Sequence, residues 1–147
     1  MNGVKIEITT RGVVNARRVL DRLSHFDTRD LLDNIGAVVE TQTRRRLSEE
    51  KTDPEGQPWE PLSERYAAWK EKHSSGGILE LEGDLIGSIT HKPSHDAVQI
   101  GSNVLYSTAH QLGTEDIPER PYLGLSDDNA DEVEEAVTTW LREVMGI

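Results

Sequence analysis

Residues 28–48, TRDLLDNIGAVVETQTRRRLS, form the stretch that decides how this chain folds. Its apolar residues recur at three- and four-residue steps and would share one face of a helix: Leu31, Leu32, Ile35, Val38, Val39 and Leu47. Asp27 is placed to cap this helix, and Asp30 adds a negative charge to its first turn. Gly36 costs about 1 kcal/mol relative to alanine inside a helix, so we expect another part of the backbone to pack closely there.

Shorter patterns on both sides predict the other elements. The alternation of Val4, Ile6 and Ile8 predicts a strand over residues 3–9. A second apolar stripe behind a capping Ser126 predicts a helix over residues 127–145. We also expect a hairpin of strands at 88–92 and 96–101, and helices at 15–24, 63–72 and 104–112. Together they predict one α+β domain over residues 1–147, with a small antiparallel sheet packed against the long helix and the C-terminal helix.

The composition narrows the class of protein. The 147 residues include no cysteine, which excludes disulfide frameworks and thiol chemistry. The formal net charge is −11, and residues 111–147 carry ten acids against two bases, a balance that disfavours nucleic acid as a partner. Because the sequence shows neither a long apolar stretch nor a signal-peptide pattern, we expect a cytosolic protein that does not enter membranes.

Histidines offer one alternative, a hydrolase. Tyr106 and His110 stand one helical turn apart and could form an acid/base pair. His91 and His95 have the four-residue spacing of a zinc-binding helix, but Pro93 between them breaks such a helix. No nucleophile motif or glycine-rich phosphate loop accompanies these residues, so we favour structural roles for them.

Arginines offer a second alternative, a nucleic-acid-binding module. Arg44, Arg45 and Arg46 are consecutive, and the basic count of the N-terminal half also includes Arg17, Arg18 and Arg22. Consecutive helical residues point about 100° apart, so the triplet surrounds the helix instead of forming one patch. At a helix C-terminus it complements the macrodipole, which is the interpretation we favour.

The most unusual segment is IPERPYLGL, residues 117–125. Pro118 and Pro121 fix two φ angles and bias the preceding residues away from the helical region, which predicts a stiff, extended segment. Such a segment loses little entropy on docking, and arginine and aromatic residues commonly anchor interfaces. We therefore expect an interface with another polypeptide, and the alternative is a loop packed on its own domain. The expected interface residues are Trp59, Arg120, Pro121, Tyr122 and Leu123.

Five blocks of residues, in this order, resemble the phage virion morphogenesis or tail completion family of Mu-like and related contractile-tailed phages. The blocks are Ile35 and Gly36; Asp53, Pro54, Gly56, Trp59, Pro61 and Leu62; Leu79, Gly83, Leu85, Ser88 and Ile89; Gly101 and Ser102 leading into Tyr106, His110, Gln111, Gly113 and Thr114; and residues 117–124, including Pro118. Glu82 and Ser107 depart mildly from the family pattern.

The resemblance implies a structural virion component without enzymatic activity, cofactor or metal, assembled in the bacterial cytoplasm. It implies a role where the tail ends and meets the head. We expect copies to associate in a closed ring, for which six would fit the tail symmetry that the family implies. The expected partners are other copies, the tail tube and the neck or connector proteins, with neither a membrane nor a specific nucleic acid among them.

Overall fold

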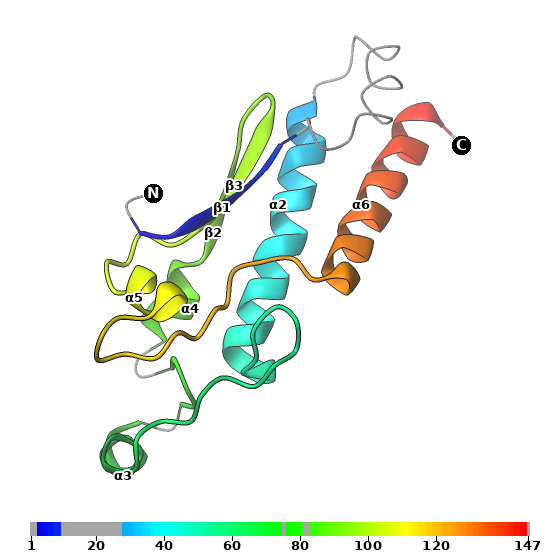
Figure 1. Ribbon diagram of the computed structural model, residues 1–147. Coiled ribbons are helices and arrows are strands. Elements are labelled where there is room, and N and C mark those ends of the chain that lie inside the picture. Colours follow the sequence, from blue (N-terminus) through cyan, green and yellow to red (C-terminus); the bar gives the residue numbers. More distant parts are fainter. Residues whose placement is uncertain (1–2, 10–27, 75, 81–82, 147) are drawn as a thin grey trace.

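The computed structural model describes residues 3–9, 28–74, 76–80 and 83–146 (Figure 1). Its elements are β1 (Lys5–Thr9), α2 (Thr28–Arg45), the π-helical turn η2 (Arg46–Glu50), α3 (Glu64–His73), α4 (Asp84–Ser88), β2 (Thr90–Pro93), β3 (Ala97–Gly101), α5 (Ser107–Leu112) and α6 (Asp127–Met145). The predicted helix over 15–24 and the predicted cap at Asp27 lie outside the described residues. The other expected elements are present, which confirms the α+β class.

Three antiparallel strands form the sheet, in the order β1-β3-β2. In β3, Ile100 lies opposite Ile6 of β1 and His91 of β2. Both Val98 and Ile100 are fully buried, because α2 packs against this sheet. The predicted hairpin of β2 and β3 is therefore confirmed.

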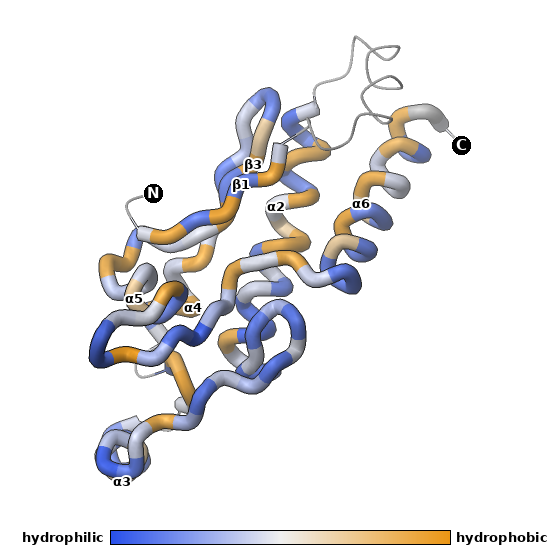
Figure 2. Tube along the Cα trace, in the orientation of Figure 1, coloured by the Kyte–Doolittle hydropathy of each residue, from blue (hydrophilic) through white to orange (hydrophobic). Residues whose placement is uncertain are grey.

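Helix α2 lies between the sheet and α6 (Figure 1). Most of its predicted apolar stripe is buried: Leu31, Leu32, Ile35, Val39 and Leu47 are at most 5% exposed. Figure 2 shows hydrophobic residues recurring along both α2 and α6, where the two helices run side by side. The long helix is thus the element on which both layers pack. No helix in the described part of the chain has the length and hydropathy needed to cross a membrane.

Local hydrogen bonds set the first residues of two helices. At the start of α6 the side chain of Ser126 accepts from the backbone N–H of Asn129, whose side chain accepts from the backbone of Ser126 in turn. This capping box confirms the predicted boundary. Helix α5 begins later than predicted, at Ser107, because Ser102 Oγ accepts from the backbone N–H of Val104 and holds the preceding residues in a turn.

Close packing at Gly36 is confirmed, although its neighbours are side chains of the sheet and not the backbone that we expected. A Cβ atom at Gly36 would lie 2.6 Å from Cδ2 of His91 and 2.7 Å from Cγ2 of Val98. Distances of that kind are well inside van der Waals contact. The absence of a side chain here lets the sheet approach α2.

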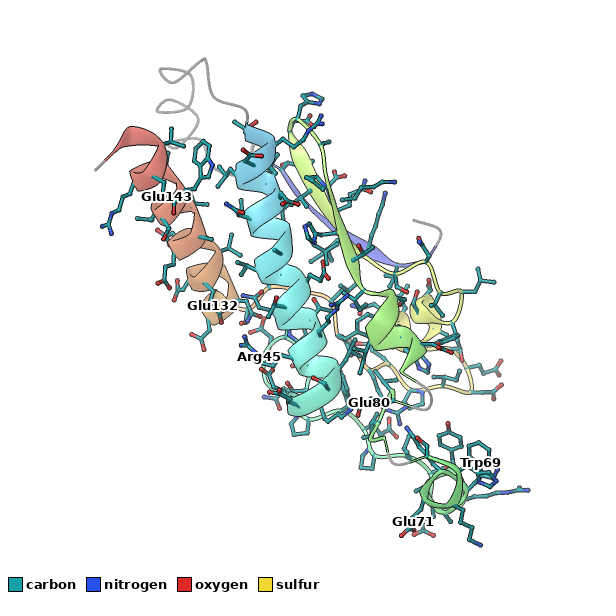
Figure 3. The ribbon with its side chains drawn as sticks, turned by 180° about the vertical axis from the view of Figure 1, so that it is seen from behind. Arg45, Trp69, Glu71, Glu80, Glu132 and Glu143 are labelled. Carbon is teal, nitrogen blue, oxygen red and sulfur yellow. The ribbon has the colours of Figure 1, made fainter. Side chains whose placement is uncertain are left out.

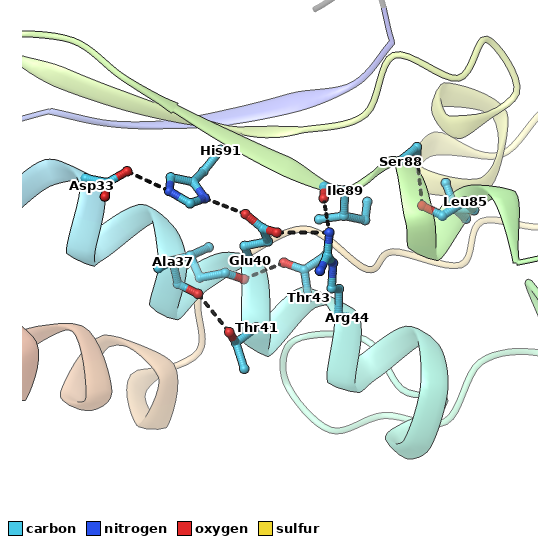
Figure 4. A network of polar contacts seen from close by, with 11 residues as sticks. Asp33, Ala37, Glu40, Thr41, Thr43, Arg44, Leu85, Ser88, Ile89 and His91 are labelled. Carbon is cyan, nitrogen blue, oxygen red and sulfur yellow. Dashed lines mark hydrogen bonds and ion pairs between the residues drawn. The ribbon is translucent and has the colours of Figure 1, made fainter.

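His91 also links β2 to α2 through polar contacts (Figure 4). Its Nε2 lies 2.9 Å from Oδ1 of Asp33, and its Nδ1 pairs with the carboxylate of Glu40. Arg44 binds the same carboxylate and donates to the carbonyl of Ile89 at 2.7 Å. Burial lowers the pKa of His91, but the hydrogen bonds and charges of Glu40 and Asp33 outweigh it and leave the pKa above its ordinary value. The imidazolium form therefore holds the sheet to the helix.

Gly36→Ala should destabilise the protein by about 1–3 kcal/mol, because the added methyl group forces the sheet away from α2. In an unobstructed helix the same change would stabilise it by up to about 1 kcal/mol. Gly87→Ala in α4 is the matched control, since nothing lies within 4 Å of a Cβ built there. Urea denaturation measures both variants, and equal effects at the two positions would contradict the packing described for Gly36.

The contribution of His91 to stability should depend on pH. Its pKa is raised in the folded state, so the contribution is complete below the unfolded pKa of 6.5 and is lost as pH rises through the folded pKa. The difference in unfolding free energy between the wild type and His91→Gln should therefore shrink as the pH rises above 6.5. His95→Gln, whose side chain is 85% exposed, is the control. A wild-type minus His91→Gln difference that stays constant or grows would refute the assignment.

Candidate functional site

The proline-bracketed segment 117–125, which we call the strap, joins α5 to α6 beside the loop of residues 51–63 (Figure 1). It has no regular secondary structure, as its two prolines predict. Prolines also remove two backbone N–H donors, so the remaining polar groups of the strap need partners elsewhere. Those partners come from α5, from the loop and from the end of the long helix.

Gln111 in α5 pairs with the strap backbone much as a neighbouring strand would. Its Oε1 accepts from the N–H groups of Tyr122 and Leu123, both at 3.0 Å, and its Nε2 donates to the carbonyl of Leu123 at 3.1 Å. The N–H of Arg120 donates to the carbonyl of His110 at 2.8 Å. This carbonyl is in the last turn of α5, where helical partners are lacking. The end of α5 and the strap thus provide hydrogen-bond partners for each other's backbone groups.

Two side chains join the strap to the loop of residues 51–63. Arg120 donates from Nε to the carbonyl of Glu60 at 2.8 Å and from Nη2 to that of Pro61 at 3.1 Å. In the opposite direction, the indole N–H of Trp59 donates to the carbonyl of Pro121 at 2.7 Å. Trp59, Pro61 and Pro121 therefore belong to one set of contacts between the strap and the loop, which we call the strap junction.

Tyr122 and Arg46 connect the strap to the core. The phenol of Tyr122 donates to the carbonyl of Ser107 at 2.8 Å, and Nη1 of Arg46 donates to the carbonyl of Tyr122 at 2.8 Å. Burial raises the pKa of Tyr122 to about 12, so the phenol stays neutral and remains a donor. Arg46 also donates to Oδ1 of Asn129, the residue that completes the cap of α6.

The structure brings the five predicted interface residues together, but mostly inside their own domain. Trp59, Arg120, Tyr122 and Leu123 are at most 6% exposed, and Pro121 is half-buried. The alternative of a loop packed on its own domain thus accounts for these side chains in a single copy of the chain. Contact with a second polypeptide is not tested by one copy and stays a prediction.

The remaining motif residues shape the turns around the strap. Gly113 ends α5 with a φ of +75°, a left-handed conformation that favours glycine, and Thr114 follows it with Oγ1 accepting from the N–H of Ile117 at 3.0 Å. Gly56 lies in the turn of the loop, and Gly83 precedes α4 as its cap. These residues set the path of the backbone at their turns.

A cavity of about 980 Å³ lies beside the strap, between α3, α4 and α5. Helix α3 stands away from the body of the molecule, as the projecting Trp69 and Glu71 show in Figure 3. Arg120 and Pro118 of the strap line the cavity, and so do Tyr106 and His110. Much of the predicted motif therefore meets at one hollow surface.

Buried basic groups dominate the electrostatics of the cavity. Burial lowers the pKa of Lys70, and nearby Lys51 lowers it further. The pKa of Arg120 is also lowered by burial, against the opposing effect of Glu60, but a guanidinium remains charged at neutral pH. Burial, followed by the charges of Arg120 and Lys70, lowers the pKa of His110 and leaves its imidazole neutral at pH 7.

The geometry gives the hydrolase alternative little support. Tyr106 and His110 do lie together, with ring centroids 5.7 Å apart at 80°. However, Nδ1 of His110 is buried without a hydrogen-bond partner, so no carboxylate of the described residues orients the imidazole. His91 points to the acids of α2, while His95 stands in solvent in the hairpin turn. Within the described ranges no three metal-ligating side chains gather.

The arginine triplet surrounds the end of α2, as predicted. Arg44 pairs with Glu40, Arg45 lies 3.9 Å from Glu132, and Arg46 is only 2% exposed. The other predicted basic residues, Arg17, Arg18 and Arg22, lie outside the described residues. The burial of Arg46 and Lys70 was not predicted from the sequence. A signal for Arg46 existed, because it falls seven residues after Val39 on the buried stripe.

Comparison with known proteins adds a second line of evidence. A model of the phage virion morphogenesis family matches residues 12–142. The putative capsid assembly protein G of Escherichia phage Mu is 33% identical over 138 residues, covering 84% of this chain and 88% of that protein. The Mu-like prophage FluMu G protein 1 of Haemophilus influenzae is 31% identical over 122 residues, covering 81% and 83%. No solved structure matches the chain.

Substitutions at Tyr122 should act on folding. Tyr122→Ala removes a fully buried ring and should destabilise the chain by about 3–5 kcal/mol, whereas Tyr122→Phe removes only one hydrogen bond and should cost about 1 kcal/mol. Tyr66→Ala on the exposed face of α3 is the control for removal of a tyrosine. Urea unfolding followed by circular dichroism measures the series. Unchanged stability of Tyr122→Ala would show that the strap does not support the core.

Proposed function

The chain belongs to the phage virion morphogenesis family, and on that premise we propose that it is a structural subunit that completes the phage tail. The similarity to a putative capsid assembly protein supports a role in virion assembly. The observation that carries the proposal is the strap junction. There the motif residues Trp59, Gln111 and Arg120 bind backbone groups and so fix the shape of the surface.

A subunit that ends a tube must present a rigid surface to its neighbours. The strap contacts α5, the loop of residues 51–63 and the end of the long helix, so its outward side is held in place before any partner arrives. Preorganisation of this kind reduces the entropy lost on docking. The buried Tyr122 and Leu123 anchor the strap, and we propose that its half-buried Pro118 and Pro121 face the partner.

We further propose that copies form a closed ring at the end of the tail tube. Apolar side chains exposed on and next to α5 supply a contact surface, with Leu105 83% and Leu112 64% exposed. An exposed leucine is stabilised when a neighbouring copy removes it from water, and a closed ring does so in every copy. Six copies would match the tail symmetry implied by the family. The neck or connector proteins would then bind the ring, which assembles in the bacterial cytoplasm and ends in the virion.

The tail-completion role is tested in a phage or prophage that carries this gene. A nonsense mutation at an early codon should leave heads and tail parts that fail to join, and plasmid expression of the chain should restore infectious particles. Electron microscopy of the lysates distinguishes the outcomes. Complete, joined particles in the absence of the chain would contradict the proposal.

Ring formation is tested with Leu105→Asp. A charge in the proposed contact should weaken association at least tenfold while leaving the folded monomer intact, because Leu105 is exposed in a single copy. Thr139→Asp on the exposed side of α6 is the control for the added charge. Native mass spectrometry across a concentration series, alone and with tail tubes, gives the oligomeric state. Equal association of both variants would exclude this surface from the ring.

A further inference from the structure

The cavity beside the strap has apolar walls and an open mouth. Its apolar lining is formed by Pro61, Leu62, Leu79, Leu85, Ile117 and Pro118. Tyr66 and Tyr106 also line it and stay 40% and 45% exposed. Binding sites in proteins are commonly built in this way, with apolar walls and a few polar groups that fix orientation. The polar groups therefore decide what the cavity accepts.

Two cationic side chains and one neutral imidazole line the cavity with hydrogen-bonding atoms available to a ligand. Lys70 is 4% exposed, and among the described residues one of its three N–H donors has a partner, the carbonyl of Gly77. Arg120 is 6% exposed, and two of its five donors bind loop carbonyls in the part of the chain that the structure describes. Nδ1 of His110 is buried and has no hydrogen-bond partner within the described residues. A buried polar group gains free energy when it finds a hydrogen-bond partner, so this lining favours an acceptor that carries negative charge.

The acidic residues of the cavity lie in a different environment from the basic ones. Glu60, Glu64, Asp84 and Asp116 line it, and all four are exposed. No carboxylate of the described residues forms an ion pair with Lys70 or Arg120. Water screens the exposed charges, whereas the buried charges act at close range in a medium of lower dielectric constant. Two carboxylates act on these buried charges, but Glu80, near Lys70, is paired with Lys51, and Glu60, near Arg120, is exposed to water. The depth of the cavity therefore still favours an anionic group.

We propose that this cavity binds an extended segment of another polypeptide, in which an Asp or Glu side chain between apolar residues pairs with Lys70 and Arg120. The apolar neighbours of that carboxylate cover the leucine and proline walls. The inference goes beyond tail completion and ring formation, because it assigns a ligand class to the cavity, where Pro118 is the one lining residue that the proposed function already turns toward a partner.

A second copy of this chain fits the cavity less well than a different protein. Among the large exposed hydrophobic residues outside the cavity, Trp69 and Leu112 lie in helices, and Leu125 is two residues before α6. Leu105 lies in an irregular segment but has no acidic residue within five positions. None of these four exposed residues therefore lies in an extended segment that has an acidic residue between apolar neighbours.

The test uses a fluorescently labelled six-residue peptide, blocked at both ends, with one glutamate between leucines, and a twin that has glutamine in that place. Anisotropy titration of the full chain should show at least tenfold tighter binding of the glutamate peptide. Lys70→Met should reduce this preference to below threefold. Lys72→Met, an exposed lysine of the same helix that does not line the cavity, should keep it. Absence of binding, equal binding of the two peptides or equal effects of the two variants would overturn the proposal.

Further measurements test whether a small carboxylate or a second copy of the chain occupies the cavity instead, and whether each variant is folded. Leu62→Asp places a negative charge on the wall and should abolish binding of the glutamate peptide, and circular dichroism checks that each variant is folded. If free 4-methylpentanoate binds as tightly as the peptide, the site takes a small carboxylate and the polypeptide assignment fails. The assignment also fails if sedimentation shows self-association that Lys70→Met removes and Lys72→Met retains, because the occupant is then a second copy.

Discussion

The buried guanidinium of Arg46 is the constraint on which the arrangement of the molecule depends. A charge that is 98% removed from solvent is costly unless its donors are satisfied, and here the acceptors are the carbonyl of Tyr122 and the side chain of Asn129. The carbonyl of Asn129 also accepts from Gln42 of α2 at 3.1 Å. One residue at the end of the long helix thereby sets the position of the strap and of the first turn of α6.

The strap contributes to both the interior and the surface. Its inward side chains complete the core under the loop of residues 51–63, and its prolines prevent it from joining the sheet. The same rigid backbone places Arg120 and Pro118 in the wall of the cavity. The stability of the core and the shape of the candidate binding surface are therefore linked, and a substitution that loosens one also alters the other.

Patterns within one segment predicted much of the fold, and contacts between distant segments were the part that they could not predict. The stripe of α2, the capping box of α6 and the β2–β3 hairpin each depend on residues that are close together in the sequence. The prolines predicted an extended strap, but not which side chains face inward. Arg46 resembles a solvent-exposed cation in the sequence, because the carbonyl that permits its burial lies 76 residues away, at Tyr122. Lys70 resembles one because its acceptor, the carbonyl of Gly77, depends on how the chain turns after α3. The ordered motif blocks pointed to the family, and the spatial junction that they form became visible only in the structure.

The long separation between the strap and its partners also determines when the protein can fold during synthesis. Arg46 and Trp59 leave the ribosome more than 60 residues before their acceptors at Pro121 and Tyr122. Until those acceptors emerge, the guanidinium and the indole N–H must remain hydrated, and the helix cannot bury its final turn. Closure of the core is therefore a late event with high contact order, and an interrupted translation product that stops before the strap lacks a native state.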